Sequence, residues 1–171
     1  MSVVKPLGPA RPDHVVVSVD RALPEVLGYL LYRCGDRALA EELTADTVLS
    51  AIDRLRRGAG DEVLTVSYLI VVARNKLVDH WRREDRERRC LFAESSQRAG
   101  AVCDEYFEPG RVDEVLAALA PMYRAALTLR YVDDLSISTV AALLGRSIAA
   151  TEMLLVRARR GFRDLYSRSE P

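Results

Sequence analysis

The sequence predicts an all-α fold made of two small helical domains joined by a flexible linker. Apolar residues recur three or four positions apart through most of 22–56 and 112–166, and the sequence has no sustained alternation of the kind that marks a half-buried strand. Between these segments the helical period is lost and the sequence runs into a Pro-Gly pair, which is typical of a linker. We therefore expect a flexible arm at 1–20, a first domain at 21–90, the linker at 91–110 and a second domain at 111–171.

The first domain is predicted to contain three helices. The first has Pro24 in its opening turn, where the fixed φ of proline suits a helix start. The Gly35-Asp36 pair separates it from a second helix, which ends at Gly58. A third helical segment is apolar at its start and then charged, because positions 74–89 hold seven basic residues against four acidic ones. We expect this helix to begin in the core and to emerge as a positive surface.

The second domain is predicted to end in a helix-turn-helix. Its third helix has Ser136 as a suitable N-cap, and Gly145-Arg146-Ser147 forms a tight turn before a longer final helix. The expected helices lie at 112–120, from Pro121 onward, at 136–144 and at 147–166.

The final helix is predicted to place its arginines outward. At 100° per residue, one stripe faces the preceding helices and consists of Ile148, Thr151, Leu155, Ala158, Phe162 and Leu165. Arg157 and Arg160 fall on the opposite face. In a helix-turn-helix the start of the second helix reaches base edges, and Glu152 could accept a hydrogen bond from a cytosine amino group. A merely solvated charged face remains an equal alternative for this motif alone.

The composition limits the classes of function that this chain can have. The chain of 171 residues has 25 basic and 25 acidic residues, so it lacks the positive charge that gives a stand-alone DNA-binding protein most of its affinity. Any binding to DNA is therefore expected to depend on a further partner. No run approaches the ~20 apolar residues of a membrane span, and prolines interrupt the N-terminus where a signal peptide would be apolar, so we expect a cytoplasmic protein.

Enzymatic and metal-binding functions have no support in the sequence. It contains no Gly-rich phosphate loop and no convincing nucleophile and base arrangement, so we expect no enzyme. The three cysteines are widely spaced without a Cys-x-x-Cys motif, which argues against a zinc site or a disulfide framework. We expect neither a metal nor another cofactor.

Three segments together resemble a known family. RALAEELTADTVLSAIDRL and TVSYLIVVARNKLVDHWRR are similar to region 2, and LAALAPMYRAALTLRYVDDLSISTVAALLGRSIAATEMLLVRARRGFR to region 4, of bacterial sigma factors of the sigma-70 family. Their order and spacing over roughly 22–166 resemble the extracytoplasmic function (ECF, group IV) type. The resemblance implies a dissociable subunit of RNA polymerase that directs promoter recognition, DNA melting and transcription initiation.

The resemblance also implies partners and residue roles. A helix of region 2 would dock on the clamp of the largest polymerase subunit, and region 4 would meet the flap of the second large subunit. Ala45 departs from the glutamine that is usual in the docking helix. The implied polymerase-binding residues are Glu41, Glu42, Leu43, Asp46 and Thr47. Those implied for the minus ten element are Arg74, Asn75, Lys76, Asp79, His80, Arg82 and Arg83. Those for the minus thirty-five element are Arg146, Ser147, Ala149, Ala150, Glu152, Met153, Arg157 and Arg160.

Three further expectations follow from the resemblance. The loop at 57–65 would form much of a pocket for an extruded base. The acidic residues of the linker, Asp104, Glu105 and Glu108, would lie towards the catalytic channel of the polymerase. An anti-sigma protein could cover the polymerase-binding surfaces.

Two other functions remain as alternatives. One is a dimeric helix-turn-helix regulator that acts without being a polymerase subunit. The other is a helical interaction module that does not bind DNA, which gains support if acidic partners neutralise the arginines of the final helix.

Overall fold

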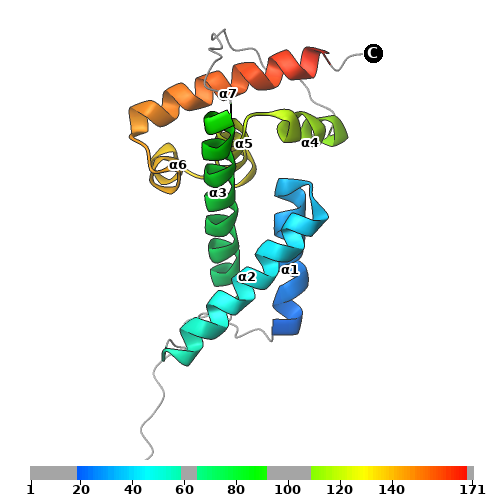
Figure 1. The fold of residues 1–171 in the computed structure, drawn as a ribbon, viewed down its shortest axis with the longest axis vertical. Helices are drawn as coiled ribbons and strands as arrows, with labels where there is room; N and C mark the ends of the chain where they lie inside the picture. Colours follow the sequence, from blue (N-terminus) through cyan, green and yellow to red (C-terminus); the bar gives the residue numbers. More distant parts are fainter. Residues whose placement is uncertain (1–18, 59–64, 92–108, 169–171) are drawn as a thin grey trace, which may run out of the picture.

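The computed structural model describes residues 19–58, 65–91 and 109–168, and all of its regular elements within these ranges are helical (Figure 1). This confirms the predicted all-α fold. The elements are α1 (Val19–Cys34), α2 (Arg37–Arg56), α3 (Val66–Leu91), α4 (Pro109–Ala118), α5 (Pro121–Leu127), the π-helix η2 (Thr128–Val132), α6 (Ile137–Leu144) and α7 (Ile148–Arg168).

The first three helices pack against one another around a shared apolar centre. In α1 the buried residues Ala22, Val26 and Leu30 are spaced four apart, so they form one stripe on the helix. The stripe of α2 is made of smaller side chains, among them Thr44 and Thr47. Each of these two hydroxyls donates to a carbonyl of its own helix at 2.7 Å, so neither hydroxyl is buried unsatisfied.

The last four helices form a second unit in which α7 packs on α4, α5 and α6. α7 runs across the end of the molecule where α3 finishes (Figure 1). Gly161 of α7 faces Leu119 and Tyr123, and a Cβ at this position would be in van der Waals contact with the Leu119 side chain at 3.4 Å.

The cores of the two units are continuous. α3 packs on α1 and α2 and also on α5 and α6, so one helix belongs to both units (Figure 1). A single cluster of buried residues extends from Ala22 of α1 to Ala158 of α7. Trp81, the largest side chain in it, is 1% exposed. The sequence predicts the two units, but it carries no pattern that predicts this contact between them.

The helices begin and end close to the residues that the sequence predicts, with two corrections. Asp36 caps α2, and Ser136 caps α6, where its hydroxyl accepts from the Thr139 amide at 3.2 Å. Pro24 was expected in the first turn, but α1 begins at Val19 and contains Pro24 in its interior. The helix tolerates this at the loss of one backbone donor. α4 begins at Pro109 rather than at residue 112, because proline suits a helix start.

We expect Gly145→Ala to lower the free energy of unfolding by about 1–2 kcal/mol, because Gly145 caps α6 with a left-handed φ of 62°. An added Cβ would also lie 3.0 Å from Nη2 of Arg82. Urea unfolding followed by circular dichroism measures the change. Gly28→Ala is the control, because Gly28 lies within α1 with open space around the new methyl, and this change should leave stability equal or higher. Equal unfolding midpoints for Gly145→Ala and the unmodified chain would contradict the expectation.

Candidate polymerase and nucleic-acid interface

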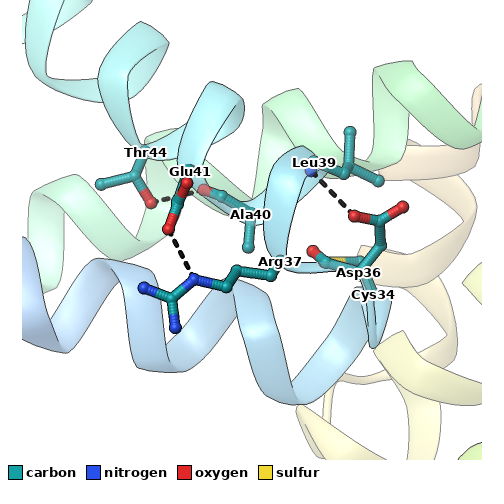
Figure 2. A network of polar contacts seen from close by, with 7 residues as sticks. All are labelled: Cys34, Asp36, Arg37, Leu39, Ala40, Glu41 and Thr44. Atoms are coloured by element: carbon teal, nitrogen blue, oxygen red, sulfur yellow. Dashed lines mark hydrogen bonds and ion pairs between the residues drawn. The ribbon is translucent and has the colours of Figure 1, made fainter.

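The N-terminal half of α2 is fixed by a network of local polar contacts (Figure 2). The Asp36 carboxylate accepts from the Leu39 amide at 3.1 Å, which satisfies one of the amides left unpaired at a helix start. One turn further, Arg37 and Glu41 form an exposed ion pair at 2.8 Å. Figure 2 shows these two side chains facing each other along the helix. The network sets where α2 begins and therefore which residues it turns outward.

The outer face of α2 is acidic. Glu41, Glu42 and Asp46 are exposed on it, and Ala45 lies on the same face with only a methyl group. Leu43 and Thr47, which were expected to bind the polymerase, are buried at 6% and 0% exposure. Little of the Leu43 side chain and none of the Thr47 side chain therefore reaches the surface, and a role for these two residues in polymerase binding stays a prediction. The four-residue spacing places both on the core stripe of the helix.

From Arg74 onward, α3 carries the predicted positive surface. Asn75, Asp79 and Arg83 are exposed, whereas Arg74, Lys76, His80 and Arg82 are half-buried. The Lys76 ammonium lies 3.8 Å from the Asp46 carboxylate of α2. The acidic face of α2 and the basic face of α3 therefore meet at this ion pair. Trp81 lies in the core between the two units and is not available to stack on a base.

Arg82 is engaged within the protein. Its Nη1 lies 3.2 Å from the Asp79 carboxylate of the same helix. Its Nη2 donates to the backbone carbonyl of Leu143 near the end of α6, beside Gly145. A guanidinium expected to follow a DNA backbone is thus held by the helix-turn-helix of the same chain.

The helix-turn-helix has the geometry that its sequence predicts. The axes of α6 and α7 differ by 96°, and Gly145 supplies the left-handed residue of the turn. Ser147 caps α7, because its hydroxyl accepts from the Ala150 amide at 3.2 Å. The exposed residues at the start and outer face of α7 are Ser147, Ala149, Ala150, Glu152, Met153 and Arg157. These residues form one continuous face over the first three turns.

The two remaining residues expected at this face are less exposed. Arg146 is half-buried in the turn. Arg160 is half-buried and lies 3.8 Å from Asp164 one turn later. Among the described residues, Arg157 has no acidic side chain within ion-pair distance. On the outer face of α7, Arg160 therefore has an acidic partner within the helix, whereas Arg157 is exposed.

One residue of the predicted core stripe of α7 is misplaced. Thr151, Leu155 and Ala158 are buried as expected, but Ile148 is 53% exposed. Ile148 is the first residue of the helix, where the neighbouring helices no longer cover the stripe. A helical period gives the direction of a side chain but not the point at which its packing partners end. Leu154, which the stripe omitted, is buried instead.

Several expected features lie outside the described residues. These are most of the loop at 57–65, the acidic residues Asp104, Glu105 and Glu108, and all but the end of the N-terminal arm. Within the loop, Thr65 is buried and its hydroxyl accepts from the Tyr68 amide at 3.3 Å, so this end of the loop caps α3.

A polar cluster between the two units was not foreseen from the sequence. We define the interdomain cluster as Tyr29 and Arg33 of α1 with Asp133, which follows η2. Arg33 contacts the Asp133 carboxylate at 2.7 Å through Nε and at 2.5 Å through Nη2. Tyr29 donates to the other carboxylate oxygen at 2.9 Å. Burial, followed by the charge of Asp133, raises the pKa of the Tyr29 phenol well above its ordinary value, so the phenol remains a donor.

The described residues contain no group of three or more His, Cys, Asp or Glu side chains placed to hold a metal. Burial raises the pKa of the Cys34 thiol, whose sulfur donates to the Leu30 carbonyl. Cys90 is exposed, and Cys103 lies outside the described residues. No single described helix is long and apolar enough for a membrane span; α6 and α7 reach that length and hydropathy only as a pair bent by 96°.

The sequence matches two families in the order expected. Residues 19–87 match Sigma-70 region 2, and residues 110–160 match Sigma-70, region 4. Together these matches span most of the described helices, including α2, α3 and the helix-turn-helix.

Similar curated proteins come from two bacteria. The chain is 29% identical over 146 residues to the ECF RNA polymerase sigma factor BldN of Streptomyces coelicolor, in an alignment that covers 81% of this chain and 55% of that protein. It therefore spans about half the length of BldN. It is 28% identical over 152 residues to the ECF RNA polymerase sigma factor SigM of Bacillus subtilis, covering 84% of this chain and 90% of SigM.

A solved structure shares the fold. The sigma factor RpoE of Bartonella quintana, solved in complex with the anti-sigma factor NepR, superposes with a TM-score of 0.53 at 19% identity, covering 89% of this chain and 96% of that one. The two family matches, the similar ECF sigma factors and this shared helical fold lead to one conclusion. The chain belongs to the sigma-70 family of RNA polymerase sigma factors and is of the extracytoplasmic function type.

Proposed function

We propose that this chain binds the RNA polymerase core, recognises the two elements of a promoter and helps to open the DNA for initiation. The observation that carries this proposal is the presence of three chemically different exposed faces on three helices of one chain. These are an acidic face on α2, a basic face on α3 and the outer face of a helix-turn-helix on α7. The unit at 21–90 would bind the polymerase core and the minus ten element, and the unit at 111–171 would bind the minus thirty-five element.

The acidic face of α2 is the proposed docking site for the clamp of the largest polymerase subunit. Glu41, Glu42 and Asp46 are exposed there, and carboxylates on a rigid helix suit basic partner side chains. Leu43 and Thr47 support this face from below by packing in the core. Ala45 offers no hydrogen bond where the family usually has a glutamine, so docking would rest on the acidic residues around it.

The basic face of α3 is the proposed site for the separated strand of the minus ten element. Lys76, Arg82 and Arg83 provide positive charge along one helix, which suits an unpaired phosphate backbone. Asn75 and His80 add polar side chains that can hydrogen-bond an extruded base.

The exposed start of α7 is the proposed reader of the minus thirty-five element. Ala149 and Ala150 are small and exposed, so the helix can lie deep in a major groove. Glu152 is placed to accept from cytosine, and Arg157 lies further along the same face, where it can meet a phosphate.

The balanced charge of the chain fits a subunit rather than an independent DNA-binding protein. With 25 basic and 25 acidic residues, the isolated chain gains little from counterion release. A polymerase that holds both units on one promoter supplies effective concentration in place of intrinsic affinity. The partners are therefore the core polymerase through clamp and flap, promoter DNA, and an anti-sigma protein, all in the cytoplasm.

The central test is run-off transcription with purified core polymerase and a library of genomic promoters. The added chain should create start sites that the core alone does not use. A dimeric regulator would instead bind duplex DNA without polymerase and elute from gel filtration as a dimer. Absence of new start sites together with no binding to the core would contradict the proposal.

We expect Glu42→Lys to weaken binding to the core polymerase at least tenfold, about 1.4 kcal/mol, because it reverses a charge on the docking face. Fluorescence titration of labelled chain with core polymerase measures this. Glu114→Lys makes the same charge change at an exposed site on α4 and should leave the affinity unchanged. Equal effects of the two substitutions would show that net charge, and not the α2 face, governs binding.

We expect Arg157→Ala to weaken holoenzyme binding to promoters and to lower the salt slope of binding by about 1, as the loss of one phosphate contact does. Binding to promoter duplexes at several salt concentrations provides the slope. Arg168→Ala removes the same charge at the far end of α7, where it is exposed, and should have little effect. The prediction fails if the two variants reduce the slope equally.

A further inference from the structure

We propose that the start of α7 reads the major-groove edges of pyrimidines in the minus thirty-five element. Ile148 and Met153 contact the methyl groups of thymines, beside a cytosine whose amino group donates to Glu152. This assigns a role to Ile148, which no expectation had placed on DNA, and names the bases that the element contains. The inference rests on the proposed function and specifies the DNA sequence that the same face recognises.

The exposed surface at the start of α7 is mostly apolar. Ile148 and Met153 are each 53% exposed, and Ala149 and Ala150 are exposed beside them. Exposed apolar side chains that adjoin one another are more typical of a binding surface than of a solvated face. Ile148 continues the apolar stripe of the helix beyond the point where the neighbouring helices cover it. Its side chain is therefore available to a partner.

Glu152 lies between the two large apolar side chains. With 3.6 residues per turn, Ile148 lies one turn before Glu152 and about 40° to one side of it, whereas Met153 lies about 100° to the other side. Four residues of helix rise about 6 Å, which is close to two base steps of about 3.4 Å each. The three side chains therefore reach bases within about two steps of one another.

The polar groups of this face do not suit purines. Guanine is commonly read by Arg or Lys and adenine by Asn or Gln, and none of these residue types occurs at positions 147–156. The Ser147 hydroxyl caps α7 by accepting from the Ala150 amide, and Thr151 is buried. Glu152 is then the charged side chain of the first two turns, and its carboxylate can only accept. An acceptor suits the amino group of cytosine, whereas in adenine the N7 acceptor beside the amino group disfavours a carboxylate.

Thymine is the base that suits Ile148 and Met153. Its C5 methyl group is the apolar feature of the major-groove edge, and aliphatic side chains contact it directly. Removal of one such methyl group from water favours binding by about fourfold. The unbranched side chain of Met153 can adapt its shape to the methyl group it meets. Thymine and cytosine at neighbouring positions thus present the methyl and amino groups that complement this face.

The charges that border the apolar surface favour DNA as its occupant. Arg146 lies in the turn before α7, and Arg157 is exposed on the third turn. Both can meet phosphates, which fix the position of a helix in the groove without reading the sequence. The side chains between them carry no positive charge, so the bases are distinguished by Glu152 and the apolar contacts alone.

The first experiment selects DNA with the holoenzyme. Core polymerase carrying the full chain is mixed with duplexes randomised over the minus thirty-five region, and the bound duplexes are sequenced. One strand of the enriched element should carry a cytosine with a thymine within about two positions of it. Glu152→Ala should remove the preference for cytosine and keep the preference for thymine. An enriched element without this pair of pyrimidines would contradict the inference.

The second experiment changes single methyl groups of the enriched element. Deoxyuridine in place of thymine removes only the methyl group, and 5-methylcytosine in place of cytosine at that position adds only a methyl group. The holoenzyme should bind thymine about fourfold more tightly than deoxyuridine, and 5-methylcytosine about fourfold more tightly than cytosine. Base pairing is the same within each comparison, so the two ratios isolate the methyl contact.

Variants of α7 then assign each contact. Ile148→Ala and Met153→Ala should each abolish the effect of the methyl group at one position, while binding to the deoxyuridine duplex stays unchanged. Met153→Leu keeps an apolar side chain of similar size and should keep the effect. Tyr32→Ala removes an exposed side chain from α1 and should keep it as well.

Two different failures can be told apart. If the unmodified chain does not distinguish thymine from deoxyuridine, or if the methyl effect survives both alanine substitutions, the inference is overturned and the proposed function stands. If the holoenzyme enriches no element at all, the proposed function fails and the inference fails with it.

Discussion

The packing of α3 against both units is the constraint on which the rest of the structure depends. Its 26 residues span roughly 39 Å, long enough to lie on α1 and α2 and then on α5 and α6. Leu77 and Trp81 are buried, whereas Arg82 and Glu84 reach polar groups of the second unit. One part of α3 thus packs in the core of the first unit, and its later part forms the contact with the second unit. This contact sets the position of the helix-turn-helix.

Charge is distributed over the surface in a way that matches three partners of different chemistry. The acidic face of α2 and the basic face of α3 adjoin at the Lys76–Asp46 pair, so a protein partner and a nucleic acid could lie side by side on the first unit. The outer face of α7 keeps small residues at its start and Arg157 further along. A neutral chain with such separated faces gains selectivity from simultaneous contacts rather than from total charge.

The contact between the units combines a shared apolar core with the buried interdomain cluster. Separation of the units would therefore expose part of this apolar core to water. The interdomain cluster adds one aspartate, one arginine and one phenol that satisfy one another's polar groups within the contact. The shared apolar residues around Trp81 join the two units into one core.

The sequence by itself determined the helices, their caps and the helix-turn-helix, because these depend on local spacing and on residues such as Asp36, Ser136 and Gly145. It also indicated the faces of α2 and α7 from their period, although Ile148 of the expected core stripe is exposed. Only the tertiary structure decided that Arg33 meets Asp133, one hundred positions away, and that Arg82 is held by α6. A helical period records which side of a helix is apolar, but the partner that covers that side is set by packing between distant segments.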